Sequence, residues 1–331
     1  MSYLSLARMP DRRLKRRHHT VPLFYLRRFA TTVTSGDGQI IRVPLLGKVP
    51  HRMTIRDATV EKDFYLFRKD SGEVSDEMEA ALGLMESESA RGFQAVVDSH
   101  QWPPSGDVRW AISGWTALQA LRGPRIRKQN DEITDAGFKL QVGVGGRPQV
   151  RRVLTQHLKR EPSEDEIEAE WSRVTDFGAY QVRSAMGAAH IKIIAELLPG
   201  TTALFHDRGW TLIRFRRRSL LTSDNPVLLH SSSDHGEGIG LATAESVAVP
   251  LSRHVALLMG ELGGPNNVVD GTTSIARRLN KLFAHNASAA VFHHPDDAPL
   301  AGVTLPEPET TTIEGPDLDH WVFPDGIPAG R

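Results

Sequence analysis

The sequence predicts an α+β domain in which a helical middle section packs on a mainly antiparallel sheet formed by N-terminal and C-terminal strands. Helical periodicity is concentrated between residues 75 and 198, whereas short apolar runs typical of strands occur before residue 68 and after residue 209. Because strands and helices are segregated along the chain, the pattern favours α+β over a doubly wound sheet.

The N-terminal part predicts one short helix followed by extended segments. Pro22 can occupy the first turn of this helix, and Leu23, Leu26 and Phe29 recur at intervals of three, so that one face is apolar. Glycine and serine predict a turn at 35–38. Two further segments are expected to be strands or extended: 39–44 and 58–67.

The middle of the chain predicts four helices. They are expected at 75–99, at 107–121, from residue 163 onwards, and at 179–198. Pro124 after Gly123 interrupts the second helix, since proline lacks an amide donor and clashes with the preceding turn. The glycines of 143–146 predict a loop, and Pro199 followed by Gly200 predicts the end of the helical section.

The last third predicts mainly strands and one helix. Apolar runs of strand type occupy 210–215, 219–221, 227–230, 246–250, 254–259 and 287–292. An amphipathic helix is expected at 273–285, with Asn280 near its apolar face. After Pro295 the chain is rich in proline, threonine and acids, and little regular structure is expected there.

Length, composition and charge distribution indicate how the chain is organised into domains and where in the cell it is expected. With 331 residues, 40% of them hydrophobic, the chain can bury a substantial core. We predict a basic, flexible N-terminus (1–17), a single domain (18–295) and an acidic, proline-rich tail (296–331). No apolar run is long enough to span a bilayer, so we expect no membrane partner and a cytoplasmic location. The absence of cysteine excludes disulfides and thiolate metal sites, and the sequence indicates no oligomeric state.

The Ser223-Asp224-Asn225-Pro226 string is the strongest candidate for part of a site. It follows an apolar strand pattern, so Asp224, with hydroxyl and amide neighbours, is expected at the end of a strand. Pro226 cannot donate a backbone hydrogen bond to a neighbouring strand and is expected to end the pairing there. The same residues also fit a structural role, because Asp and Asn side chains form turns with nearby backbone amides.

One hypothesis is metal-assisted hydrolysis of a phosphate ester or phosphodiester. It assigns catalysis to His19, Arg122, Arg125 and Asp224. It assigns substrate binding to Tyr25, Gln119, Ser223 and Asn225, and metal binding to Glu79 and Glu86. Carboxylates and imidazole can bind a divalent metal ion, and arginines can neutralise an anionic transition state. No metal motif with a fixed spacing is present, and His19 and Arg122 each also fit a structural role beside a helix end.

The alternative is a module that binds an anionic small molecule or nucleic acid without turnover. Basic residues cluster at the N-terminus, at Arg27 and Arg28, and again at Arg214 and 216–218, where they could contact phosphates. The formal net charge of zero argues against a dedicated nucleic-acid binder. A serine hydrolase using Ser223 is disfavoured, because the Gly-x-Ser-x-Gly turn is absent and an acid follows the serine.

Several of these residues together resemble a known family. The pattern His19-x-x-Pro22-x-x-Tyr25-Leu26-x-x-Phe29 and the 223–226 string are its most specific parts. Looser matches occur at Tyr65, Glu79, Glu86, Gln119, Arg122, Arg125, Pro250, Leu251 and Asn280. Over residues 18–292 the chain is similar to the bacterial domain of unknown function 4238. The resemblance implies a common fold and brings no activity with it. The family often has asparagine or glutamine before the histidine, where this chain has His18.

Overall fold

The computed structural model describes residues 14–32, 37–69, 71–183, 188–232 and 239–307. Contacts group them into two compact units. The first unit takes its residues from 1–125 and 185–308, and the second from 126–184. The single domain at 18–295 stays a prediction. Of the predicted basic N-terminus (1–17) and acidic tail (296–331), residues 1–13 and 308–331 lie outside the described part.

The α+β class is confirmed, because the described residues combine helices with mainly antiparallel sheets. The α-helices are α1 (Leu23–Leu26), α2 (Glu77–Phe93), α3 (Gly106–Arg122), α4 (Pro124–Leu158), α5 (Glu164–Thr175), α6 (Ala188–His206) and α7 (Thr273–His285). A 3-10 turn (Arg27–Phe29) follows α1, and a π-helical turn (Gln94–Asp98) follows α2. No helix in the described part of the chain is both long and apolar enough to cross a bilayer.

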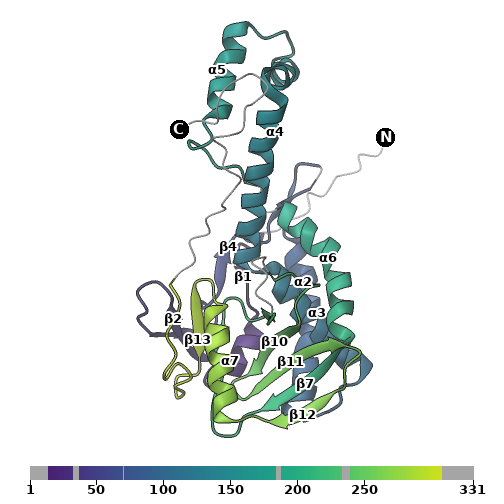
Figure 1. The fold of residues 1–331 in the computed structure, drawn as a ribbon, viewed down its shortest axis with the longest axis vertical. Helices are drawn as coiled ribbons and strands as arrows, with labels where there is room; N and C mark the ends of the chain where they lie inside the picture. The colour runs from purple at the N-terminus through teal and green to yellow at the C-terminus, as the bar shows by residue number, and fades with distance from the viewer. Residues whose placement is uncertain (1–13, 33–36, 70, 184–187, 233–238, 308–331) are drawn as a thin grey trace, which may run out of the picture. The chain divides into compact units, whose positions relative to one another are not determined.

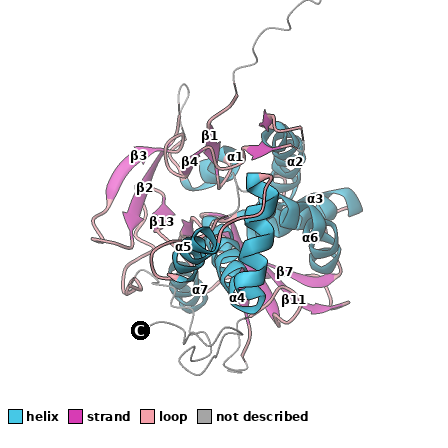
Figure 2. Cartoon of the chain, turned by 90° about the horizontal axis from the view of Figure 1, so that it is seen from above, coloured by secondary structure: helices cyan, strands magenta, loops and turns pink. Residues whose placement is uncertain are grey.

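Two larger sheets form in the first unit (Figures 1 and 2). The five-stranded sheet has the order β12 (Asn267–Asp270), β7 (Arg208–Arg214), β11 (Val255–Leu262), β10 (Ser246–Ser252) and β9 (Leu228–His230). The four-stranded sheet has the order β3 (His51–Thr54), β2 (Gln39–Pro44), β13 (Ala290–His293) and β8 (Thr222–Ser223). Two short pairs join β1 (Arg17–His19) to β4 (Val60–Lys62) and β5 (Phe67–Arg68) to β6 (Val74–Ser75). Strand β13 lies between β2 and β8, so N-terminal and C-terminal strands share one sheet, as predicted.

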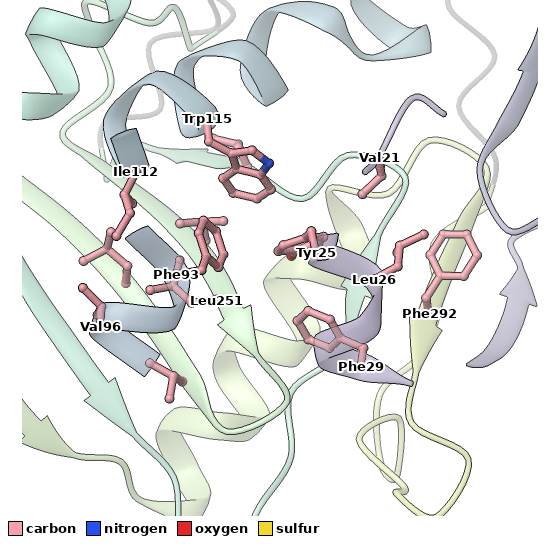
Figure 3. Packing of buried hydrophobic residues seen from close by; sticks show 14 of the residues in the cluster. Val21, Tyr25, Leu26, Phe29, Phe93, Val96, Ile112, Trp115, Leu251 and Phe292 are labelled. Carbon is pink, nitrogen blue, oxygen red and sulfur yellow. The ribbon is translucent and has the colours of Figure 1, made fainter. Parts of the chain in front are cut away.

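The main core of the first unit joins α1, α2 and α3 to the five-stranded sheet. Tyr25 is fully buried, with its ring centroid 4.7 Å from that of Trp115 and 6.1 Å from that of Phe93. Leu257 belongs to the same cluster from the side of the sheet. Figure 3 shows Leu26 pointing from α1 towards Phe292 of β13. Helix α1 therefore packs between the helices and both sheets, which explains the aromatic spacing in its sequence.

Helix α6 continues through Pro199, where the sequence predicted the end of the helical section. That prediction was wrong because the residues beyond the proline are buried: Thr201, Thr202 and Phe205 are at most 7% exposed. Burying this turn in the core offsets the backbone hydrogen bond that proline removes.

The predicted loop at 143–146 is also wrong, since these glycines lie inside α4. The helix is interrupted only at Gly146, whose φ of 57° favours glycine. Val150 after this break is buried against Trp171 of α5. Packing between the two helices therefore maintains α4 through a sequence with low helix propensity.

Helix α5 begins at the predicted serine, which forms a capping box. The Ser163 hydroxyl accepts a hydrogen bond from the backbone N–H of Glu166, and the Glu166 carboxylate accepts one from the N–H of Ser163. Hydrogen bonds from Arg160 and from the Ser163 backbone lower the pKa of Glu166 to about 2. The start of this helix is thus fixed by local contacts that the sequence already indicates.

Candidate functional site

Tyr25, a predicted substrate-binding residue, lies in the core of the first unit. Its hydroxyl donates to the Pro250 carbonyl at 2.8 Å. Because a phenol has one proton, the Thr222 hydroxyl at 2.7 Å must donate to it. Burial raises the pKa of Tyr25 and keeps the phenol neutral. The side chain joins α1 to β8 and β10, and a substrate would have to open the core to reach it.

Asp224, a predicted catalytic residue, binds backbone amides beyond the end of α7. Its two carboxylate oxygens accept hydrogen bonds from the N–H groups of Ser288 at 2.9 Å and Ala289 at 2.7 Å. Burial raises the pKa of Asp224, while these backbone hydrogen bonds act in the opposite direction. The carboxylate thus fixes the connection between α7 and β13.

The neighbours of Asp224 are hydrogen-bonded in the same way. The Ser223 hydroxyl donates to the Asn225 carbonyl at 2.8 Å and accepts from the Asn225 N–H at 3.2 Å. The Asn225 amide donates to the Asn286 carbonyl, and the Asn286 amide returns a hydrogen bond to the Asn225 carbonyl. We call these residues the β8 network: Tyr25, Thr222, Ser223, Asp224 and Asn225. Its side chains mainly bind the backbone.

The two adjacent histidines also bind backbone groups. Nδ1 of the buried His18 accepts from the Tyr65 N–H at 2.9 Å, so its Nε2–H donates to the Lys15 carbonyl at 2.9 Å. His19, the predicted catalytic histidine, donates from Nε2 to the Arg56 carbonyl at 2.9 Å. The two rings therefore attach β1 to the segments on either side of β4, through Arg56 before it and Tyr65 after it.

Arg122 joins two other predicted site residues in the helical layer. Its side chain is fully buried, and its Nη1 donates to Glu86 of α2 at 3.1 Å. In the amide orientation that satisfies both groups, the Gln119 oxygen accepts from Nε of Arg122 at 2.8 Å and from Nη2 at 2.6 Å. The structure thus brings together one predicted catalytic, one substrate-binding and one metal-binding residue as a polar bridge between α2 and α3.

The remaining predicted residues are less closely grouped. Glu79 lies on α2 two turns before Glu86, and Arg125 is exposed in the first turn of α4. No three histidine, aspartate or glutamate side chains gather as a possible metal site anywhere in the described ranges. Glu79 and Glu86 therefore have no third metal ligand among those residues.

The segments that carry the predicted catalytic residues nevertheless meet at one pocket. Thr20, Pro124 and Asp224 line a pocket of about 320 Å³, which we call the Asp224 pocket. Its lining includes Thr20, next to His19, and Pro124, two residues after Arg122, while those two side chains bind the Arg56 carbonyl and Glu86. Of the three side chains predicted to meet, only Asp224 lines this pocket, and the imidazole of His19 and the guanidinium of Arg122 bind other partners.

A separate polar surface is formed by two adjoining pockets of about 230 and 540 Å³ that share Arg216 and His254. We call this surface the basic groove. Its arginines come from three parts of the chain: Arg28, the cluster formed by Arg214 and 216–218, and Arg277. Two of these arginines have carboxylate partners among the described residues: Arg28 with Asp98 at 3.1 Å and Arg216 with Asp270 at 3.7 Å. Within the described residues, Arg217, Arg218 and Arg277 are exposed and form no ion pair.

The wall of the groove is held by the buried Asn280 of α7. Its amide donates to the carbonyls of Ser219 at 3.0 Å and Pro299 at 3.2 Å, and its oxygen accepts from the Leu221 N–H at 3.0 Å. The sequence indicated the 214–218 cluster but missed Arg277 and His254. The available signal for Arg277 was its place on the polar face of the helix predicted at 273–285.

The comparisons with known proteins give a family and no activity. The family model of the protein of unknown function DUF4238 matches residues 17–297. No curated protein and no solved structure matches the chain. The matched part contains α1, the β8 network, both larger sheets and Asn280, and it covers most of the chain. The chain therefore belongs to the DUF4238 family.

Proposed function

We propose that this protein binds the phosphate groups of a nucleic acid through the basic groove. The observation that carries the proposal is the exposed position of Arg217, Arg218 and Arg277, which have no carboxylate partner among the described residues. Cations that face water without a partner can neutralise phosphates and release their counterions, which favours association.

The lining of the groove favours contact with phosphates over contact with bases. Among the described lining residues there is no tryptophan or tyrosine, and the Phe215 ring is buried. Binding without stacking on bases depends weakly on sequence and strongly on salt. Asn280 supports the proposal because it holds the arginine loop in place without contributing a charge.

Metal-assisted hydrolysis of a phosphate ester is the second candidate and stays a prediction. The convergence of Thr20, Pro124 and Asp224 at one pocket favours it. The engagement of the predicted catalytic side chains with backbone groups and with Glu86 makes it the weaker candidate. Incubating labelled DNA with the protein and Mg²⁺, Mn²⁺ or Zn²⁺ tests it, with Asp224→Ala for comparison.

Fluorescence anisotropy with labelled duplex DNA and single-stranded RNA, over a range of salt concentrations, tests the binding proposal. Replacing Arg216, Arg217 and Arg218 by alanine should weaken binding and reduce the magnitude of the salt slope by up to about 3, because each phosphate contact contributes about 0.9. A matched control removes three exposed cations elsewhere in the first unit: Arg52, Lys62 and Lys192.

The control variant should keep most of the affinity and the slope. Equal loss of affinity in both variants would contradict a specific groove and indicate attraction to net charge alone. A third variant, in which Arg8, Arg12 and Arg13 are replaced by alanine, separates the groove from the N-terminal basic segment. If this third variant alone loses binding, the proposal is wrong.

A further inference from the structure

The Asp224 pocket carries opposite charges on one face of the four-stranded sheet. Phe292 of β13 pairs with Arg42 of β2 on one side and with Thr222 of β8 on the other. Directly paired residues project to the same face of a sheet, as do residues two apart on one strand. Asp224 follows Thr222 by two residues, and its N–H continues the ladder to the Ala290 carbonyl. Arg42 and Asp224 therefore share the face that forms the pocket floor, and both line the pocket.

Both charged groups can bind a ligand. Arg42 is partly exposed and forms no ion pair within the described part of the chain. The Asp224 carboxylate, which accepts from the N–H groups of Ser288 and Ala289, lines the pocket and brings a negative charge to it. The buried Ser288 hydroxyl beside Asp224 has no hydrogen-bond partner, although it lines the same pocket. A buried hydroxyl without a partner is uncommon and indicates a position that a ligand or water fills.

The other ionisable groups of the pocket exclude a simple anion site. Asp57 accepts from Arg17 at 2.5 Å, whereas Glu61 is exposed and forms no ion pair with any described residue. His51 stands beside Arg42 on the neighbouring strand β3. The carboxylates thus outnumber the guanidinium of Arg42, so a purely anionic ligand would meet net repulsion. A ligand that carries both charges would find a partner at each end.

The size of the pocket sets the length of such a ligand. Arg42 and Asp224 are two strands apart and offset by two residues, which places their Cα atoms about 12 Å apart at ordinary strand spacing. Both residues line the pocket that lies between these positions. The pocket volume of about 320 Å³ suits a molecule the size of an amino acid or a dipeptide.

We propose that the Asp224 pocket binds a small zwitterion, whose ammonium group lies at Asp224 and whose carboxylate lies at Arg42. This site is separate from the basic groove, and its failure would leave the proposed nucleic-acid binding unaffected.

Isothermal titration with three related peptides tests both charges on the ligand. Glycylglycine carries an ammonium and a carboxylate, N-acetylglycylglycine carries only the carboxylate, and glycylglycine amide carries only the ammonium. Glycylglycylglycine, a longer zwitterion with one ammonium and one carboxylate, serves as a second probe. We expect the zwitterions to bind the full chain, and each singly charged analogue to bind at least tenfold more weakly, because it leaves one protein charge without its partner.

Two variants test the protein side. Arg42→Gln should weaken binding of the zwitterions at least tenfold. Arg52→Gln should leave it unchanged, because Arg52 pairs with Ile41 and faces the opposite side of the same sheet. Asp224 is not substituted in this test, because its carboxylate also binds backbone amides and its loss would destabilise the fold. The analogue without an ammonium group tests the contact with Asp224 instead.

Four results would overturn the proposal, three of them in the experiments above. These three are equal binding by the zwitterions and the singly charged analogues, equal loss of binding in both arginine variants, and no Arg42-dependent binding of any probe at millimolar concentration. Inorganic phosphate is included as a probe. Phosphate binding that requires Arg42 and exceeds that of the zwitterions would assign the pocket to anions and would also overturn the proposal.

Discussion

The β8 network and the basic groove lie in the same unit and differ in what their polar side chains bind. In the β8 network, Tyr25 and Asp224 bind groups of the protein itself. The contact of Tyr25 with Thr222 joins residues 197 positions apart, and that of Asp224 with Ala289 joins residues 65 positions apart. In the groove, Arg217 and Arg218 extend into solvent and have no ion partner among the described residues. The side chains of the most distinctive sequence motif therefore bind mainly the protein itself, whereas these arginines of the groove face solvent.

This difference has a physical basis. A polar side chain that becomes buried must find hydrogen-bond partners, so its identity is tightly constrained by the fold. An exposed arginine loses nothing in the folded state when it has no partner, and it remains available for a ligand. Asn280 lines the groove, but it is buried and hydrogen-bonded to the backbone like the side chains of the β8 network.

Asn280→Ala should have the largest effect. The substitution leaves the Leu221 N–H and two carbonyls without their partner in a buried place, and we expect a loss of about 3 kcal/mol in the free energy of unfolding. Chemical denaturation measures it, with the exposed Asn267→Ala as the control. Nucleic-acid binding by the folded variant should also weaken. If stability falls while binding persists, the groove does not depend on this wall.

Asp224→Ala should destabilise the protein by about 2 kcal/mol, because two backbone N–H groups lose a charged acceptor. The effect is smaller than for Asn280, since burial disfavours the carboxylate and the adjoining pocket admits water. Glu261→Ala removes an exposed carboxylate and serves as the control. Unchanged stability together with a complete loss of nucleic-acid binding would show that Asp224 serves binding and not folding.

Much of the fold could be predicted from the sequence, where local signals and packing agree. Helix α7 was predicted with its observed bounds, because its apolar stripe is regular and Thr272 supplies an N-cap. Helix α6 was predicted to end too early, since the local signal of Pro199 opposes the burial of Phe205. Strand β12 was missed because it has only two apolar residues, Val268 and Val269, and depends on pairing with β7.

The candidate site was less predictable for a related reason. The sequence indicated that Asp224 ends a strand, but it could not reveal that the acceptors of Asp224 face amides sixty-four and sixty-five residues away. Likewise, Glu86 and Arg122 were predicted in one site without any indication that they pair across two helices. Such contacts depend on the tertiary arrangement, which residue type and spacing do not determine.

Acid should destabilise the protein through two buried histidines at the end of β13. Burial lowers the pKa of His293 and His294 below the ordinary value of 6.5. His294 Nδ1 accepts from the Asp296 N–H, so a proton there would oppose this hydrogen bond. Because the folded state favours the neutral rings, their contribution to stability is full above pH 6.5 and is lost as the pH falls below it.

Unfolding measured between pH 8 and pH 5 checks this effect, which should be smaller than the two substitutions above. His294→Asn keeps an acceptor near the Asp296 N–H and has no ring to protonate, so its stability should fall less steeply. His285→Asn changes an exposed histidine and should follow the wild type. Parallel pH profiles for the wild type and His294→Asn would show that this ring is not the titrating group.

Arg217→Ala should have the smallest effect on stability and therefore gives the sharpest contrast with the β8 network. The side chain is exposed and has no ion partner among the described residues, so the free energy of unfolding should change by less than about 0.5 kcal/mol. Removing one of three adjacent like charges relieves repulsion, so any change should be stabilising.

The same substitution should reduce the magnitude of the salt slope of nucleic-acid binding by about 1. Arg52→Ala, an equally exposed arginine outside the groove, should change neither quantity. A loss of stability comparable to that of Asp224→Ala would mean that this arginine, too, serves folding rather than binding.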